Sequence, residues 1–365
     1  MKKRLIFIGN IFIQNRPFRD YITRSVEADG SLIDALEYYL EADRDFYGDL
    51  EKRLDAQESI YIIASKKSFT LVGKLLCTLL DDKLVLKEQM LLPSQSETFA
   101  KDSYLLLAGR CRINVLQAKE SRELPQLLIG EPSSKRKLHF FETPIKEVIA
   151  ALKPLAGQFD VTLRFSQIVE NWVEVDVTCN TYGSIDRFIQ IAEEKHSGHI
   201  IVAEDLLQHI IDALLRNRQT ITLAESCTGG LLASLFTAHA GVSSVFEGSL
   251  VTYSNLLKER WLAVDNDTLV DNGAVSEAVV SEMCEGALNV ANADYALAIS
   301  GVAGPDGGSD EKPVGTVVVG VRSRNFENVI QYHFNGDRNY VQQQSAYTAL
   351  KMLVLGDKKV FFKNS

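Results

Sequence analysis

Short apolar runs separated by amphipathic stretches dominate the first 130 residues. Arg4–Gly9 and Ser59–Ala64 have the uninterrupted apolar character of buried strands, while Arg19–Leu40 and Thr70–Leu80 carry mostly helical spacing. Shorter strand candidates are Leu84–Leu86, Tyr104–Leu107 and Leu127–Ile129. Strands that alternate with helices predict an α/β unit with a largely parallel sheet.

A change in composition follows. Glu131–Lys137 (EPSSKRK) combines charge with Pro and Ser, which predicts a linker. After it, a small α+β unit is expected. Its elements are a helix over Thr143–Leu155, strands over Val161–Phe165 and Trp172–Thr178, and a helix over Ser184–Lys195.

From Glu204 onward the alternation of elements is clearest. The predicted helices are Asp205–Arg216, Leu231–His239, Ser276–Ala291 and Arg338–Leu353. The predicted strands are Thr220–Ala224, Ser249–Tyr253, Tyr295–Gly301, Gly315–Val321 and Val329–Phe334. This order predicts an α/β/α sandwich, so the chain divides into three expected domains, at residues 1–130, 138–202 and 204–357.

The net charge and the cysteines indicate which kinds of ligand and which cellular compartment to expect. The net charge of −9 argues against binding duplex nucleic acid, although a small anionic ligand needs only a few local donors. Five scattered cysteines without metal-ligand spacing favour reduced thiols and a cytoplasmic location. No apolar run approaches the roughly 18 residues of a membrane span, and the start MKKRLIFIGNIF fits a buried strand better than a signal peptide.

The stretch Thr222–Gly230 (TLAESCTGG) places hydroxyls between a strand and a helix. Ser226 then lies at the positive end of that helix, where free backbone N–H groups stabilise developing negative charge or hold a phosphate. The simpler alternative is that Ser226 or Thr228 only caps the helix, which is the commoner role of a lone hydroxyl at such a place.

A serine nucleophile needs a base. Five of the six histidines fall on the edges or faces of predicted elements and the sixth, His139, falls in a linker, so each is expected to have a surface or packing role. Lys258, in Val251–Lys258 (VTYSNLLK), is the better candidate, because burial lowers the pKa of a lysine, and Tyr253 in the same stretch can position a proton. A solvated lysine and a core tyrosine are the alternatives, and spacing alone favours them.

Two later stretches suggest ligand contacts. Ile299–Thr316 (ISGVAGPDGGSDEKPVGT) is a Gly- and Pro-rich loop after an apolar strand, which predicts either close approach to a ligand or a wide surface turn. Asn335–Arg338 (NGDR) places Arg338 at a helix start, suited to a phosphate or simply exposed beside the cap Asp337.

Taken together and in this order, these segments resemble the C-terminal domain of the CinA family, whose stand-alone form is the nicotinamide-nucleotide amidase PncC. The family motifs AESCTGG, VxYSNxxK, GAVS, TGxAGPxGGxxxKPVGT and a terminal G-D/R-R have counterparts here. They are Ala224–Gly230, Val251–Lys258, Gly273–Ser276, Ser300–Thr316 and Gly336–Arg338, with Val242–Gly248 in place of the serine-rich segment. The match covers about 145 residues, and Ser300 replaces the usual threonine.

The resemblance implies hydrolysis of nicotinamide mononucleotide to nicotinic acid mononucleotide and ammonia. Ser226 would be the nucleophile, Lys258 the base and Tyr253 an assistant, with no metal or cofactor. Thr228, Gly229 and Gly230 would line the oxyanion and phosphate region. Ser300, Gly301, Gly304 and Arg338 would hold the nucleotide.

The N-terminal part resembles the remainder of the family more weakly. It would be a degenerate molybdopterin-binding-like domain followed by a small KH-type domain. At the place of the family's GGLGPTxDD pyrophosphatase motif the chain has Ala64–Thr70 (ASKKSFT), so that activity is not expected, and without a GxxG loop RNA binding is not expected either. A homo-oligomer is expected. The alternative function is a non-catalytic competence- or damage-inducible factor that binds a nucleotide or a protein.

Overall fold

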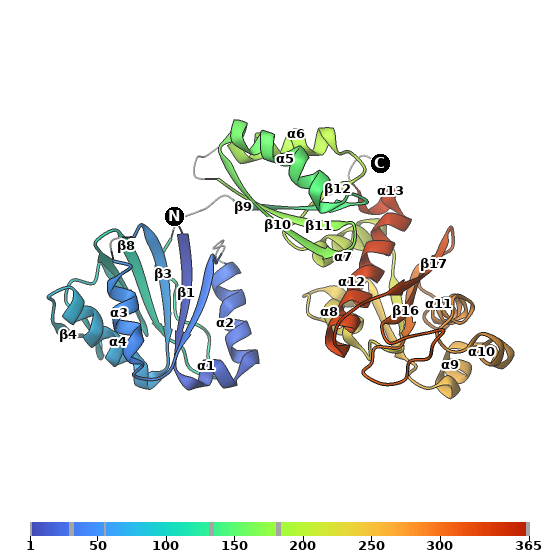
Figure 1. The fold of residues 1–365 in the computed structure, drawn as a ribbon, viewed down its shortest axis with the longest axis horizontal. Helices are drawn as coiled ribbons and strands as arrows, with labels where there is room; N and C mark the ends of the chain where they lie inside the picture. The colour runs from blue at the N-terminus through green and yellow to red at the C-terminus, as the bar shows by residue number, and fades with distance from the viewer. Residues whose placement is uncertain (1, 29–32, 55, 131–134, 180–183, 363–365) are drawn as a thin grey trace. The chain divides into compact units, whose positions relative to one another are not determined.

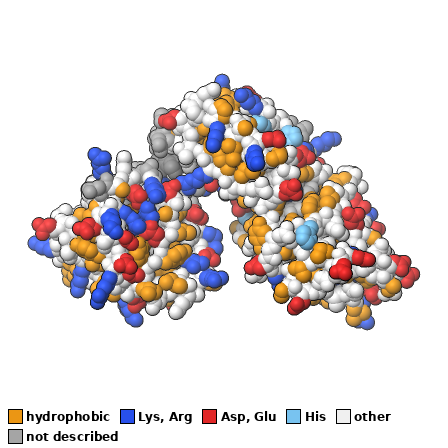
Figure 2. All heavy atoms as spheres, in the orientation of Figure 1, with side chains coloured by type: hydrophobic (Ala, Val, Ile, Leu, Met, Phe, Trp, Pro, Cys, Tyr) orange, Lys and Arg blue, Asp and Glu red, His pale blue; other side chains and the backbone are white. Residues whose placement is uncertain are grey.

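The structure is a computed structural model that describes residues 2–28, 33–54, 56–130, 135–179 and 184–362. It divides into two compact units, residues 1–134 and 135–365. On the face shown in Figure 2, acidic and basic side chains are interspersed over each unit. Among the described residues, no helix is long and apolar enough to cross a membrane.

The first unit is built on a six-stranded sheet (Figure 1). Its strand order is β2 (Ala35–Tyr39), β1 (Lys2–Ile8), β3 (Glu58–Ala64), β8 (Cys111–Gln117), β7 (Ser103–Ala108) and β6 (Thr98–Ala100). The first four are mutually parallel, and β7 and β6 are antiparallel additions. Helices α1 (Asn10–Gln14), α2 (Arg16–Ala28), α3 (Arg44–Glu51) and α4 (Lys66–Leu79) and the hairpin β4 (Leu84–Lys87)–β5 (Met90–Pro93) complete it.

Three sequence expectations fail in this part of the chain. The helix expected over Arg19–Leu40 ends at Ala28, and Ala35–Tyr39 is a strand, because half-buried and exposed residues alternate there as on an edge strand. Leu127–Ile129 forms no strand, and Ile129 instead packs as coil into the core while the Leu128 N–H donates to Asn114 Oδ1. Of the expected linker, residues 131–134 lie outside the described residues, and Lys135–Lys137 begin a strand.

The second unit begins with a four-stranded antiparallel sheet. Its order is β10 (Val161–Val169), β11 (Trp172–Cys179), β9 (Lys135–Phe141) and β12 (Ile200–Val202), with α5 (Ile145–Phe159) and α6 (Ser184–Lys195) packed on it. His139 is therefore not in a linker, since it lies buried on β9. The likeness of this segment to a KH-type domain stays a prediction.

The rest of the second unit is a five-stranded sheet of order β14-β13-β15-β16-β17, in which β14, β13 and β15 are parallel. The strands are β13 (Ile221–Glu225), β14 (Phe246–Val251), β15 (Tyr295–Gly301), β16 (Thr316–Ser323) and β17 (Glu327–His333). The helices are α7 (Leu206–Asn217), α8 (Leu231–Thr237), α9 (Asn255–Leu262), α10 (Asn266–Asn272), α11 (Glu277–Ala291), α12 (Arg338–Gly356) and α13 (Lys358–Phe361).

Side-chain size separates the two faces of this sheet. On β15, Tyr295, Leu297 and Ile299 enter the core shared with α7, α8 and α12, whereas Ala296 and Ala298 face α9 and α11. A Cβ on Gly320 of β16 would stand 2.8 Å from Val280 of α11, so small residues on that face allow close packing. The sheet thus has helices on both faces, and the protein is a mixed α/β chain with several sheets (Figure 1).

Candidate active site

Ser226 lies in the turn between β13 and α8. Its backbone N–H donates to the Ile299 carbonyl of the neighbouring strand at 2.9 Å, and its carbonyl accepts from the Gly229 N–H at 3.1 Å. The side chain is 8% exposed. The turn therefore fixes the backbone of Ser226 at the carboxyl ends of parallel strands, where open α/β sheets bind ligands.

The side-chain carboxylate of Glu225, the last residue of β13, lies at the N-terminus of α8. The carboxylate is fully buried and accepts four hydrogen bonds, from the N–H groups of Gly230 (3.0 Å), Leu232 (3.1 Å) and Ala233 (2.9 Å) and from Ser249 Oγ (3.1 Å). A carboxylate at this place satisfies the free helix amides and complements the helix dipole. The N-terminal amides of α8 are thus already occupied, contrary to the expectation that they receive an oxyanion.

Replacing Glu225 with glutamine is expected to destabilise the second unit by about 2–4 kcal/mol, because one oxygen becomes an amide and buried donors lose their acceptor. Tryptophan fluorescence during urea unfolding reports this unit, since Trp172 and Trp261 are the only two tryptophans of the chain and both lie within it. Glu247→Gln, an exposed change on β14, is the control and should shift stability by less than about 0.5 kcal/mol. Equal effects of the two changes would contradict the role of Glu225.

Lys258 reaches Ser226 from α9. Ser254 caps this helix, and Lys258 follows one turn later with its side chain 1% exposed. Its Nζ lies 3.0 Å from Ser226 Oγ and 2.9 Å from the Thr252 carbonyl oxygen. Burial lowers the pKa of Lys258 below its ordinary value of 10.5, and among the described residues no carboxylate forms an ion pair with it. The geometry and the lowered pKa are those of a lysine that can accept the serine proton.

Tyr253 and Arg338 form a pair at the pocket mouth. Tyr253 is 61% exposed, and its hydroxyl accepts from Arg338 Nη2 at 2.8 Å. Among the hydrogen bonds of the described residues, none joins this hydroxyl to Lys258. Arg338 is the first residue of α12, which Asp337 caps, and its Nη1 donates to the Gly304 carbonyl at 2.6 Å. Arg338 therefore joins the Tyr253 segment to the loop after β15.

That loop closes tightly on the strand ends. The Val302 N–H donates to Thr316 O at 2.8 Å, and the Gly315 N–H donates to Val302 O at 2.7 Å. A Cβ on Gly301 would stand 2.7 Å from Val317, so the close approach requires glycine there. Ser300 donates its hydroxyl to Ala274 O at 2.7 Å, which holds the Gly273–Ser276 segment against β15.

These elements enclose a pocket of about 260 Å³. The expected site residues that line it are Ser226, Tyr253, Lys258, Ser300, Gly301, Gly304 and Arg338. Thr228, Gly229 and Gly230 are not among its lining residues. Sequence reasoning missed Cys227, Asn255, Ala274 and Asp306, which also line it and lie inside the quoted motifs. Cys227 is buried, and burial raises the pKa of its thiol to about 12.

Comparison with known proteins finds relatives over the same part of the chain that carries these motifs. The model of the CinA C-terminal domain matches residues 203–355. The nicotinamide-nucleotide amidohydrolase PncC of Escherichia coli is 48% identical over 149 residues, which cover 40% of this chain and 90% of that protein. This chain belongs to the CinA family.

Longer members of the CinA family match only in part. A CinA-like protein of Fervidobacterium nodosum is 39% identical over 196 residues, which span 54% of this chain and 46% of that protein. The chain thus matches about half the length of such relatives. The solved competence/damage inducible protein CihA from Agrobacterium tumefaciens is 39% identical and matches over 41% of this chain and 93% of its own, with a TM-score of 0.40. All the lining residues of the pocket fall inside the region matched by the CinA C-terminal domain.

Proposed function

We propose that the chain hydrolyses the carboxamide of nicotinamide mononucleotide, giving nicotinic acid mononucleotide and ammonia. The observation that carries the proposal is the contact of 3.0 Å between Lys258 Nζ and Ser226 Oγ on the wall of a pocket. The identity to the Escherichia coli amidohydrolase over 90% of that protein supports the choice of substrate.

The reaction begins with neutral Lys258. Ser226 Oγ attacks the carboxamide carbon while its proton passes to Lys258 Nζ, and the carbonyl oxygen becomes an oxyanion. The Thr252 carbonyl, at 2.9 Å from Nζ, orients the lysine amine. The resulting ammonium of Lys258 then gives a proton to the departing nitrogen, which leaves as ammonia. Water, activated by the again neutral Lys258, cleaves the acyl-enzyme and restores the Ser226 hydroxyl.

The amide of Cys227, a residue that lines the pocket, is the proposed oxyanion donor. In this turn the amides of Ser226, Gly229, Gly230 and Leu231 are already engaged. Those of Cys227 and Thr228 have no acceptor on any other residue in the described part of the chain. Backbone donors fixed beside the nucleophile stabilise the charge that develops in acyl transfer.

The remainder of the pocket is proposed to hold the nucleotide. The exposed ring of Tyr253 offers a surface for the pyridine ring, and Arg338 beside it offers its guanidinium to the phosphate. We propose that the first unit serves as a scaffold or an oligomer contact, because its Ala64–Thr70 segment lacks the glycines and the acidic pair of the family's pyrophosphatase motif.

The proposal is tested by incubating the purified full chain with nicotinamide mononucleotide and measuring ammonia and nicotinic acid mononucleotide together. Equimolar release of both products is expected, with free nicotinamide, which lacks the ribose phosphate, turned over far more slowly. Absence of both products with correctly folded protein would reject the amidase and favour a non-catalytic factor that binds a nucleotide or a protein.

A further inference from the structure

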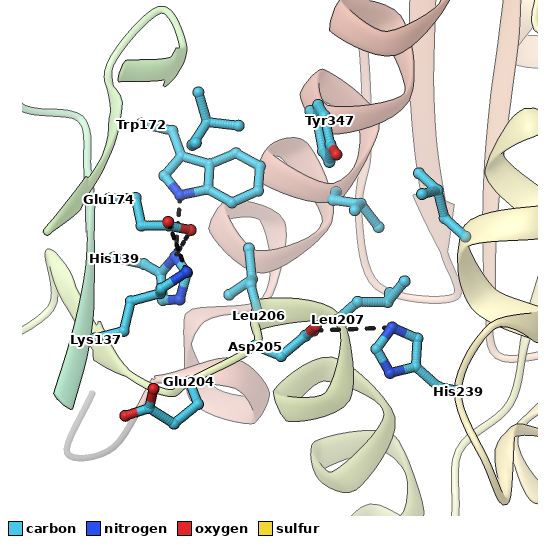
Figure 3. Close-up of a pocket in the computed structure, with 13 residues that line it drawn as sticks. Lys137, His139, Trp172, Glu174, Glu204, Asp205, Leu206, Leu207, His239 and Tyr347 are labelled. Carbon is cyan, nitrogen blue, oxygen red and sulfur yellow. Dashed lines mark hydrogen bonds and ion pairs between the residues drawn. The ribbon is translucent and has the colours of Figure 1, made fainter. Parts of the chain in front are cut away.

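A second cavity lies in the unit formed by residues 135–365, with a volume of about 250 Å³ (Figure 3). Strands β9 and β11 of the four-stranded sheet form one wall, and helices α7, α8 and α12 form the others. None of its lining residues lines the catalytic pocket. The proposed amidase reaction therefore gives this cavity no role.

One side of the cavity is aromatic and apolar. The rings of Trp172 and Tyr347 meet nearly perpendicularly with their centroids 5.9 Å apart, and Leu206 and Leu207 of α7 also line the cavity. The indole N–H of Trp172 is not available to a ligand, because it donates to His139 Nδ1 at 3.3 Å. This wall accordingly presents carbon atoms and π faces to an occupant.

His139 offers no free hydrogen-bonding atom to a ligand. Its Nε2 lies 3.0 Å from the Ala203 carbonyl, so both ring nitrogens are used. Burial lowers the pKa of His139 to about 4, which keeps the ring uncharged at neutral pH. The buried wall thus carries no positive charge from this histidine.

Carboxylates outnumber ammonium groups among the residues that line the cavity. Glu174, Glu204 and Asp205 contribute three carboxylates against the single ammonium of Lys137. Lys137 is already paired, because its Nζ lies 2.7 Å from Glu174. Glu204 and Asp205 therefore carry the excess negative charge, although Asp205 also caps α7 and lies 3.9 Å from His239 Nε2.

We propose that this cavity binds a small organic cation, a protonated amine carried on an apolar body of about one ring. The body would lie against Trp172, Tyr347 and the leucines, and the ammonium would be held by Glu204 and Asp205, which also line the cavity. A dry cavity of about 150 Å³ accommodates benzene, so the volume here admits a ring with a short amine-bearing arm. Aromatic faces and carboxylates both favour a cation, and anionic ligands are disfavoured by the same charges.

The size and the charge of the ligand can be tested with three probes that share one ring: benzylamine, benzyl alcohol and benzoate. In the full chain carrying Trp261→Phe, Trp172 is the only tryptophan and reports directly from the cavity wall. Trp261 is 49% exposed on α9, so its replacement is expected to leave the fold unchanged. Benzylamine is expected to change Trp172 emission saturably, with a dissociation constant about tenfold lower than that of benzyl alcohol, and benzoate is expected to give no change.

Charge-neutral variants then locate the cation. The double variant Glu204→Gln/Asp205→Asn removes both carboxylates while asparagine still caps α7, and it should abolish the tenfold preference for benzylamine without affecting benzyl alcohol. The matched control Glu247→Gln/Asp271→Asn makes the same charge change at two exposed positions that do not line the cavity, and it should keep the preference. The proposal is overturned if benzylamine shows no saturable effect, if benzyl alcohol binds equally well, or if both double variants behave alike.

Discussion

Replacing Ser226 with alanine is expected to reduce turnover of nicotinamide mononucleotide by at least about 10³-fold, because the proposed acyl-enzyme forms on its Oγ. Only the Oγ atom is lost, and this atom is hydrogen-bonded to Lys258 Nζ. The backbone bonds from the Ser226 N–H to Ile299 and from the Gly229 N–H to Ser226 do not depend on the side chain. The variant should therefore unfold at the same urea concentration as the parent, and the loss should appear in kcat of the ammonia assay.

Cys227 provides the matched control for Ser226. It is the next residue and lines the same pocket, but burial raises the pKa of its thiol to about 12, so the thiolate is scarce at neutral pH. Cys227→Ala should retain turnover within about tenfold of the parent, since the side chain contributes packing and no chemistry. If Cys227→Ala were as inactive as Ser226→Ala, the assignment of Ser226 as the nucleophile would be contradicted.

Most elements of the second unit could be predicted from the sequence because their patterns are local. Tyr295–Gly301 and Ser184–Lys195 have the predicted bounds, and the strand predicted at Thr220–Ala224 is shifted by one residue. Apolar periodicity of this strength arises from burial on one or two faces, which is what fixes these elements. The α9 helix was missed as an element, although Lys258 on it was singled out.

The failures have non-local causes. Ala35–Tyr39 is a strand because β1 offers it a parallel partner 31 residues away, a contact that no local window contains. Glu225 was overlooked because a glutamate at a strand end is usually solvated, whereas here three amides and Ser249 surround it. Likewise, only the tertiary structure shows that Arg338 reaches both Gly304 and Tyr253.

The pKa of Lys258 was the part of the mechanism that the sequence could not supply. In the sequence, Lys258 cannot be told apart from any charged lysine on a helix, because the pKa of a lysine depends on what surrounds its Nζ. The structure buries the side chain, and within the described part of the chain only Ser226 Oγ and the Thr252 carbonyl lie within hydrogen-bond distance of Nζ. Burial favours the neutral amine, which converts a residue that is usually charged into a candidate base.

Replacing Lys258 with methionine is expected to reduce kcat by at least about 10³-fold, because methionine fills a similar volume but accepts no proton. In the parent, kcat should rise with pH as Lys258 loses its proton and then reach a plateau, and the rise should be centred below 10.5 because burial lowers the pKa. Residual activity of Lys258→Met should lack this rise. A parent profile that stays flat from pH 6 to 10 would remove Lys258 from the role of base.

The same lowered pKa sets a stability signature that is independent of turnover. Between the folded pKa of Lys258 and the unfolded value of 10.5, the unfolded chain binds more protons than the folded chain, so unfolding free energy rises with pH across that window. Below the window the lysine is protonated in both states, and the cost of burying its charge is complete. Lys258→Met removes the cost, so the variant should be more stable than the parent at pH 7 and should lose that advantage as pH approaches 10.5. Urea unfolding of both proteins at a series of pH values measures the difference, and a variant that is less stable at pH 7 would show that Lys258 is retained there for its contacts and not at an energetic cost.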